Sequence, residues 1–405
     1  MHLDIVSVAG GGRGVGRAEG QVWFVAGALP GERVEVAAER KRAGIVEARA
    51  LAVTNPSPWR DPEPCPVAGE CGGCDLAHVR RESAGDVLRE VVAGALRHAP
   101  LLLAETVRTA PVEISPMGWR LRARLHWDPA ARRLGFRGPR SHRVVGIAPC
   151  RVVSPLLLGV LPELERALAG ARLGAGEVEW LESLDASRAV ASWRGGGDPP
   201  HVSVPGLAGW RRLDEQGVSG SGWGSNGVVM DLPVPLFVPV GAFFQGNRFL
   251  VRRLFDRIAG LASSSGCARV VDLYGGVGLL AAAAHAGGAV DLTVVEAQPV
   301  AAAAARRNLA GRRVVTGPAE AFLVAPGPGE GTLAILDPPR GGLSELARAR
   351  LLEWRPTEII VLACDPGRFG RDAGMFLEAY RLQSLEIWDL FAGSHHAEIL
   401  AVLRR

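Results

Sequence analysis

From about residue 240 onward, short apolar runs alternate with stretches whose apolar residues recur at helical spacing. Leu250, Leu254, Ile258 and Leu261 form one such helical stripe. The apolar runs predict strands at 268–273, 291–296, 333–337, 358–363 and 384–390. Strands that alternate with helices are typical of a doubly wound parallel sheet, so we expect an α/β fold for this part of the chain.

The final strand, expected at 397–403, breaks this parallel pattern. Only six residues, 391–396, separate it from the strand before it, whereas a parallel crossover needs about a dozen or more. We therefore expect it to run antiparallel to its neighbours. Its first residues then lie at the edge of the sheet where the other strands end, which places Glu398 at the same edge as Cys364.

The first 56 residues carry a different pattern. Short β-forming segments are expected at 4–8, 21–25, 32–37 and 44–53, separated by glycine-rich turns. This spacing is typical of a small barrel. The proline pairs within 55–58 and 61–64 predict a rigid linker after it.

Between these regions the pattern is mixed. We expect a helix at 82–98, alternating strands over 115–150, a helix near 155–170 and short strands over 178–240. The chain therefore divides into an N-terminal barrel at 1–56, a central α+β domain at 57–236 and an α/β domain at 237–405. The helix at 82–98 is also a candidate to pack on the last domain.

The composition describes an ordinary soluble protein, since 48% of the 405 residues are apolar and 22% are charged. The apolar runs are interrupted too often to span a bilayer. The N-terminus lacks the basic start and apolar core of an export signal. We therefore expect a cytoplasmic protein with no membrane partner.

Positive charge gathers in the first part of the chain. Residues 1–150 carry 21 Arg and Lys against 16 Asp and Glu, whereas the net charge of the whole chain is +4. Within 115–150, eight arginines and one acid lie among Trp119, Trp127 and Phe136. Basic residues interleaved with aromatics suit phosphate contacts and base stacking, which indicates nucleic-acid binding. A solvated sheet face would show the same pattern.

Two reactive groups follow consecutive strands of the predicted sheet. Asp337 comes after the apolar run at 333–336, and Cys364 comes after the run at 358–362. In an open α/β sheet, ligands bind at the edge where parallel strands end. Cys364 is therefore a candidate nucleophile. The alternative is a buried structural thiol, as we expect for Cys267.

A glycine-rich turn at 272–278 follows the first sheet strand, and Glu296 ends the next one. Glycines at such a turn allow close approach of a ligand, and an acid at the second strand can accept hydrogen bonds from ribose hydroxyls. Dehydrogenases share this turn, but it lacks the full G-x-G-x-x-G spacing. A packing turn with a solvated acid is the other reading.

Six segments in order resemble the AdoMet-dependent RNA uracil-5-methyltransferases. They are 243–247 (FFQGN), 272–278 (DLYGGVG), 295–296 (VE), 337–343 (DPPRGGL), 364–366 (CDP) with Arg371 and Asp372 behind it, and 396–398 (HAE). The resemblance implies a Rossmann-like class I methyltransferase domain. It also implies that Cys364 is the nucleophile and that Glu398 is the base. The residues that it implies for AdoMet binding are Gln245, Tyr274, Glu296 and Asp337.

These residue types fit the chemistry that the resemblance implies. A thiolate that adds to carbon 6 of uracil turns carbon 5 into an enolate carbon that can attack a methyl sulfonium. A carboxylate must then remove the proton from carbon 5. The chain departs from the family at Ala363, Asp365, Gly341 and Gly275. Asp365 should oppose thiolate formation, and we expect Arg368 or Arg371 to offset it.

Four further cysteines, Cys65, Cys71, Cys74 and Cys150, have a spacing that suits either tetrahedral zinc or an iron–sulfur cluster. Ribosomal-RNA members of the family carry a [4Fe–4S] cluster on this pattern, so the resemblance implies a cluster. Residues 1–56, with Gly31-Glu32-Arg33-Val34, are similar to a TRAM domain, which is an OB-like RNA-binding barrel.

We therefore predict a monomeric RNA 5-methyluridine methyltransferase. TRAM and cluster together favour 23S rRNA as the substrate, and transfer RNA is the alternative. A non-catalytic RNA-binding or ribosome assembly factor with the same fold is a hypothesis of another class. An NAD-linked or redox iron–sulfur enzyme is a third.

Overall fold

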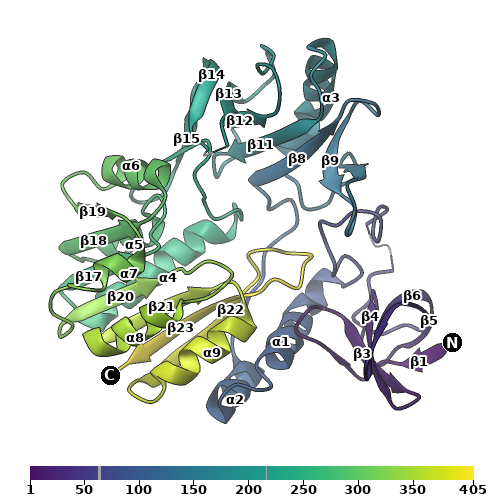
Figure 1. Ribbon diagram of the computed structural model, residues 1–405, viewed down its shortest axis with the longest axis horizontal. Helices are drawn as coiled ribbons and strands as arrows, with labels where there is room; N and C mark the ends of the chain where they lie inside the picture. The colour runs from purple at the N-terminus through teal and green to yellow at the C-terminus, as the bar shows by residue number, and fades with distance from the viewer. Residues whose placement is uncertain (63–64, 216) are drawn as a thin grey trace.

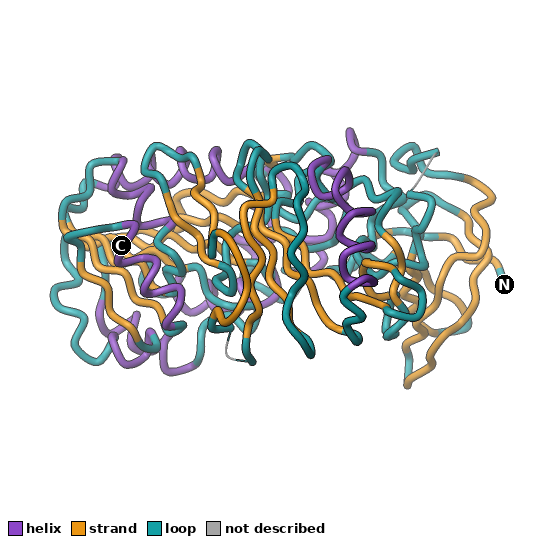
Figure 2. The backbone as a smooth tube through the Cα atoms, turned by 90° about the horizontal axis from the view of Figure 1, so that it is seen from above, coloured by secondary structure: helices purple, strands orange, loops and turns teal. Residues whose placement is uncertain are grey.

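The computed structural model describes residues 1–62, 65–215 and 217–405. The chain forms three units, which are an N-terminal sheet, a central sheet and a larger α/β sheet (Figure 1). The two chain ends lie at opposite ends of the molecule in both views (Figures 1 and 2). Glu63 and Pro64, which end the predicted linker segment 61–64, lie outside the described residues.

The N-terminal unit is one six-stranded sheet that curves back on itself. Its strands are ordered β1-β5-β6-β4-β3-β2. They span His2–Asp4 (β1), Ser7–Val8 (β2), Gly14–Ala18 (β3), Gln21–Ala26 (β4), Arg33–Arg42 (β5) and Ile45–Asn55 (β6). Gly16 allows the closure, because a Cβ there would lie 2.7 Å from the Asp4 carbonyl oxygen.

The strand predicted at 4–8 is two strands instead of one, and β3 was not expected. The chain changes partner between two adjacent residues. The Ile5 amide donates to the Glu32 carbonyl at 2.9 Å, whereas the Val6 amide donates to the Val15 carbonyl at 2.9 Å. A period-two pattern continues through such a switch, so the sequence alone does not reveal it.

The central unit is a seven-stranded sheet in the order β10-β9-β8-β11-β12-β13-β14. Its strands are Arg122–Asp128 (β8), Arg133–Arg137 (β9), Val144–Gly146 (β10), Gly176–Glu182 (β11), Ala189–Arg194 (β12), Leu207–Leu213 (β13) and Ser219–Gly224 (β14). Helix α3 (Pro155–Gly170) packs against this sheet, and a pair, β15 (Gly227–Met230) and β16 (Leu236–Pro239), leads to the third unit.

The aromatic residues of the arginine-rich segment are core residues. Trp119 and Trp127 are each 2% exposed and Phe136 is 8% exposed. The prediction that they stack on nucleic-acid bases is therefore wrong for these three rings. Alternation in the sequence reflects a sheet with one buried face and one basic face.

The third unit confirms the predicted α/β fold. Its sheet has the order β19-β18-β17-β20-β21-β23-β22-β7. The strands are Arg269–Leu273 (β17), Asp291–Glu296 (β18), Arg313–Thr316 (β19), Thr332–Leu336 (β20), Glu358–Ala363 (β21), Arg381–Trp388 (β22) and Glu398–Arg404 (β23). As predicted, β23 runs antiparallel, and it does so against both β21 and β22.

Helices cover both faces of this sheet (Figures 1 and 2). They are Leu250–Ser265 (α4), Leu279–Ala286 (α5), Pro299–Asn308 (α6), Ala319–Phe322 (α7), Glu345–Trp354 (α8) and Pro366–Phe376 (α9). The two faces hold separate apolar cores, one with α4 and α5 and the other with α8 and α9.

An earlier segment of the chain completes the second core. Helices α1 (Ala84–Ala95) and α2 (Leu101–Thr109) place Leu88, Leu103 and other buried side chains beside Phe369 of α9. The two-residue strand β7 (Val112–Glu113) then pairs in parallel with β22. Residues 84–113 are therefore part of the α/β unit, although the central sheet follows them in sequence.

Within the described ranges, none of the helices combines the length and apolar character that crossing a membrane requires.

Glu32 ties the N-terminal sheet to the segment that follows it. Its carboxylate is buried and accepts hydrogen bonds from the Leu29 amide at 2.8 Å, the Ser57 amide at 3.1 Å and Arg60 Nε at 2.5 Å. Burial alone would raise the pKa of Glu32, but these hydrogen bonds outweigh it and lower the pKa below its ordinary value of 4.5.

We predict that Glu32→Gln lowers the free energy of unfolding of this unit by about 2 kcal/mol at neutral pH, because it weakens hydrogen bonds to a buried charged acceptor and leaves half-buried Arg60 without its counter-charge. A group whose pKa is lowered by folding stabilises the folded state above its ordinary pKa, and this contribution disappears as the pH falls. Urea denaturation at pH 7 and pH 3 measures both effects. Equal stability of variant and wild type at pH 7 would contradict the prediction.

Candidate active site and cysteine cavity

Strand ends bring the candidate catalytic residues together. Asp337 follows β20 and Cys364 follows β21, and these two strands are parallel neighbours. The register of β21 against β23 pairs Ala363 with Ile399. One step further along the ladder, Cys364 therefore lies opposite Glu398. The expectation that the final strand starts at this edge of the sheet is correct.

Burial and mutual repulsion raise the pKa values of these acids and of the thiol in the free protein. Burial raises the pKa of Cys364 to about 12, and the nearby Glu398 and Asp337 add to this rise. Burial also raises the pKa of Glu398 well above its ordinary value, and Asp337 raises it further. Two carboxyl groups and a thiol in one buried site cannot all carry charge without a cation.

Arg340 is the cation that faces this group. It lowers the pKa of both Cys364 and Glu398, against the effect of burial. Sequence reasoning had expected Arg368 or Arg371 in this role. Arg371 instead pairs with Asp372 at 2.7 Å. The loop that carries Arg340 therefore decides the charge balance of the site.

Asp365, which the sequence predicts to oppose thiolate formation at Cys364, has a structural role. Its carboxylate caps helix α9 by accepting a hydrogen bond from the Arg368 amide at 2.9 Å. An acid at a helix N-terminus compensates the helix dipole. Capping of α9 is therefore one role of the Asp365 carboxylate.

Asp372 fixes the loop at 337–343, and sequence reasoning gave it no separate role. Its carboxylate accepts hydrogen bonds from the Leu343 amide at 2.9 Å and from Arg348 Nη1 at 3.1 Å. Arg348 in turn donates to the Leu343 carbonyl at 2.7 Å. This buried ion pair holds the position of Arg340 relative to the strand ends.

Three buried oxygens at the same edge lack a hydrogen-bond partner among the described residues. They are Gln245 Oε1, Asp272 Oδ1 and Glu398 Oε2. Gln245 Nε2 donates to Asp337 Oδ2 at 3.2 Å, which links Gln245 to Asp337. Buried acceptors without partners are costly, and a bound ligand with several donors would satisfy them.

The glycine-rich turn is held by Glu296. Its carboxylate accepts from the Gly276 amide at 2.8 Å and from the Gln298 amide at 2.6 Å. Each carboxylate oxygen keeps a second lone pair for a ligand hydroxyl. Gly275 is required here, because a Cβ would lie 2.6 Å from Val294 Cγ1. Packing therefore explains this departure from the family.

Tyr274 lies at the end of β17 in a left-handed backbone conformation, with φ of 63°. Burial raises the pKa of its phenol, and Glu320 and Asp372 raise it further, so the hydroxyl remains protonated. The residue is half-buried beside the turn. A non-glycine residue in this conformation is strained and is often found at functional sites.

Phe243 is an exposed aromatic side chain that sequence reasoning did not single out. Its ring is 51% exposed and lies two residues before Gln245, and the Arg122 guanidinium is 5.6 Å from its centroid. An exposed ring beside an arginine suits stacking on a base. Its position in the sequence, within the segment 243–247, was the available signal.

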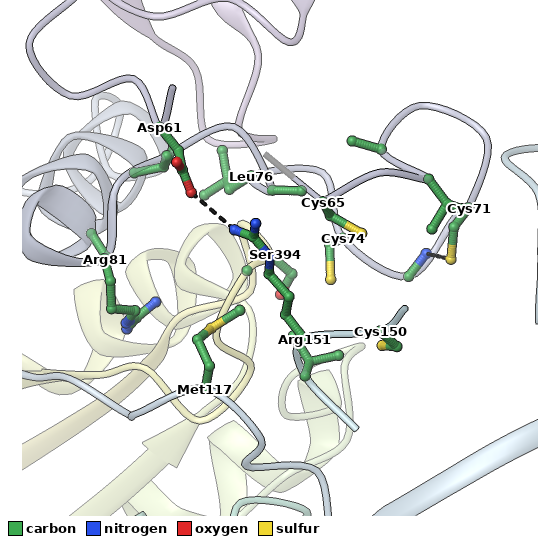
Figure 3. A pocket seen from close by; sticks show the side chains of 18 of the residues that line it. Asp61, Cys65, Cys71, Cys74, Leu76, Arg81, Met117, Cys150, Arg151 and Ser394 are labelled. Carbon is green, nitrogen blue, oxygen red and sulfur yellow. Dashed lines mark hydrogen bonds and ion pairs between the residues drawn. The ribbon is translucent and has the colours of Figure 1, made fainter. Parts of the chain in front are cut away.

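The four predicted cluster cysteines line one cavity of about 150 Å³ (Figure 3). All four are free thiols. Burial raises the pKa of Cys74 to about 12 and also raises that of Cys71. As the side chains are placed, no three His, Cys, Asp or Glu residues of the described chain are close enough to hold a metal ion.

Arg120 faces these cysteines, although the sequence placed it on an RNA-binding surface. Its guanidinium lies 4.9 Å from the Trp119 ring centroid and 5.1 Å from that of Phe136. Burial lowers the pKa of Arg120, and the nearby Cys74, Cys150 and Cys71 oppose this. A half-buried cation beside these thiols suits an anionic group in the cavity.

Comparison with known proteins supports the resemblance. Residues 5–51 match the TRAM domain. An uncharacterized RNA methyltransferase from Streptomyces avermitilis is 32% identical over 99% of this chain and 97% of its own. The 23S rRNA (uracil(1939)-C(5))-methyltransferase RlmD from Pseudomonas putida is 30% identical over 99% of this chain and 93% of its own.

The fold also matches a solved structure, that of Pyrococcus abyssi tRNA (uracil-54, C5)-methyltransferase in complex with S-adenosyl-L-homocysteine. The TM-score is 0.79 at 20% identity, and the match covers 100% of both chains. The likeness at this identity concerns the fold. Together with the two relatives, it shows that this chain belongs to the TRAM-containing family of RNA uracil-5-methyltransferases.

Proposed function

We propose that this chain transfers a methyl group from AdoMet to carbon 5 of a uridine in RNA. The observation that carries the proposal is the register of β21 and β23, which sets Cys364 opposite Glu398. A nucleophile and a base on neighbouring strand ends can flank one pyrimidine ring. Asp337 lies beside both, where a cationic methyl donor would balance the acidic charge.

The residues of the chain divide the reaction between them. Bound AdoMet supplies an electrophilic methyl group and a positive charge. Gln245, Asp337, Glu296 and Tyr274 would hold and orient it. The Cys364 thiol gives its proton to water and its sulfur bonds to carbon 6, so that the electron pair of the C5–C6 double bond becomes an enolate. Carbon 5 of this enolate takes the methyl group, and S-adenosylhomocysteine is left. Glu398 then takes the proton from carbon 5, and the bond between sulfur and carbon 6 breaks.

The pKa shifts fit a site that is prepared by its ligand. In the free protein, burial raises the pKa of Glu398, which favours its protonated form over the carboxylate that a base requires. A sulfonium charge beside Asp337 and Glu398 favours their ionised forms. Binding of the donor would therefore favour ionised carboxylates up to the methyl transfer, which removes the sulfonium charge before Glu398 acts.

The substrate that we propose is 23S rRNA, as for the Pseudomonas relative, with transfer RNA as the alternative. The target uridine must leave its stack to reach Cys364. The protein would act as a monomer in the cytoplasm. Mass spectrometry of 5-methyluridine in ribosomal and transfer RNA, from cells with and without this chain, distinguishes the two substrates. No loss from either RNA would refute the proposal.

We predict that Cys364→Ala abolishes methyl transfer but still binds AdoMet, because the thiol is needed only for attack on the base. Glu398→Gln should still form the covalent bond to RNA and then stall, with release slowed by about 10²–10⁴-fold. Single-turnover assays with denaturing gels detect the trapped adduct. Normal turnover of Cys364→Ala would exclude the mechanism, because transfer would then not need the thiol, whereas no turnover by the wild type would leave a non-catalytic RNA-binding factor.

Affinity for AdoMet should fall as the pH is lowered through about 7. Burial raises the pKa of Asp337 to about 7, and Glu296 contributes to this rise. Since a cation binds the ionised carboxylate, protonation below this pH should weaken binding by up to about tenfold per pH unit. Isothermal titration calorimetry at several pH values measures this affinity. In Asp337→Asn the binding should be weak and independent of pH over 6–8, and an unchanged pH slope would contradict the assignment.

We also propose that Cys65, Cys71, Cys74 and Cys150 hold a [4Fe–4S] cluster. The fit rests on the cavity that all four thiols line and on the cation Arg120 beside it. The cluster requires thiolates, and its iron would lower the raised pKa values of Cys71 and Cys74. Zinc, the alternative that the spacing allows, would need less volume.

Anaerobically purified protein should therefore contain about four iron and four sulfide per chain and show a broad absorbance band that oxygen bleaches. Arg120→Met should lower the iron content or accelerate bleaching, because it removes a buried counter-charge, whereas Arg124→Met on the exposed sheet face should not. Stoichiometric zinc without iron would refute the cluster.

A further inference from the structure

The segment between β22 and β23 contacts every unit of the molecule before it reaches Glu398. Asp389 pairs with Arg81, which precedes α1. The Trp119 indole donates to the Ala392 carbonyl at 3.1 Å, and the Leu76 amide donates to the Gly393 carbonyl at 3.0 Å. The segment therefore receives hydrogen bonds both from the central unit and from residues 65–76, the cysteine-bearing segment that holds Cys65, Cys71 and Cys74.

Two contacts between His395 and Asp75 link the segment between β22 and β23 to the cysteine-bearing segment. The His395 amide donates to Asp75 Oδ1 at 2.8 Å, and His395 Nδ1 contacts Asp75 Oδ2. Asp75 directly follows Cys74. Gly393 rests on the same cysteine, because a Cβ there would lie 3.2 Å from Cys74 Sγ. The N-terminal sheet adds Gly12, where a Cβ would lie 2.7 Å from His395 Cβ.

The position of the Glu398 carboxylate depends on this backbone. The residue is 2% exposed, and none of the described side chains hydrogen-bonds to its Oε2. Only His396 and Ala397 separate it from His395. The path of the chain into β23 therefore decides where the carboxylate lies, and His395 is the last residue of that path with a side chain tied to another unit.

We propose that Asp75 and His395 are positioning residues that align Glu398 for removal of the proton from carbon 5. The inference rests on the proposed function and adds to it that the cysteine-bearing segment sets the geometry of the base. Attack by Cys364 and methyl transfer precede the action of Glu398. Loss of the Asp75–His395 link should therefore slow adduct release and leave adduct formation intact.

The test compares Asp75→Asn, His395→Leu and His395→Asn. Asparagine at 395 keeps a donor near the place of Nδ1, so this variant should recover most of the wild-type rate. Asp86→Asn, on the exposed face of α1 and paired with Arg89, is the matched control. Each is measured for AdoMet affinity, iron content, rate of adduct formation and rate of release in a single turnover.

We expect Asp75→Asn and His395→Leu to release RNA at least tenfold more slowly, with adduct formation and AdoMet affinity within about twofold of the wild type. His395→Leu leaves the cysteine segment unchanged, so normal iron content in this variant separates positioning from cluster loss. Release at the wild-type rate in both variants would overturn the inference, as would equal loss of adduct formation and release. A wild type that makes no adduct would refute the proposed function instead.

Discussion

The site depends on one electrostatic constraint: two carboxyl groups and a thiol share a half-buried edge of the sheet, and Arg340 faces them. Asp337, Glu398 and Cys364 each have a raised pKa, and burial is the largest cause each time. A carboxyl group that holds a proton on folding lowers the stability of the folded state at neutral pH. The fold tolerates this cost because large apolar cores on both faces of the sheet stabilise the strands that carry these groups.

Hydrogen bonds from backbone and side chains hold the loops around this site in place. Asp372 and Arg348 hold the loop with Arg340, and Glu296 holds the glycine-rich turn. Asp365, which looked like an additional unfavourable charge, is used to cap a helix. Preorganised groups of this kind need little rearrangement when charge develops during a reaction.

Much of this arrangement follows from the sequence, since strands that alternate with helices and a loop too short for a crossover predict the sheet and the direction of β23. The placement of Glu398 at the same edge of the sheet as Cys364 follows from this topology, whereas the register that sets the two opposite each other comes from the structure. What the sequence does not reveal is tertiary. Trp119, Trp127 and Phe136 alternate with arginines as in a nucleic-acid surface, yet they are buried. Arg120 belongs to that series but faces the cysteines, and the contact between Asp75 and His395 joins residues 320 positions apart.

Strand β7 has a consequence for how the protein is made. Val112 of β7 pairs with Ile387 of β22, about 275 positions later in the chain. At a synthesis rate of about 5–20 residues per second, β7 and the helices before it wait roughly 15–55 s for their partner to leave the ribosome. During that time the apolar side chains of α1 and α2 have no sheet to cover, which makes this stretch a candidate client of ribosome-associated chaperones. An expression fragment that starts at residue 237 would lack the same edge strand.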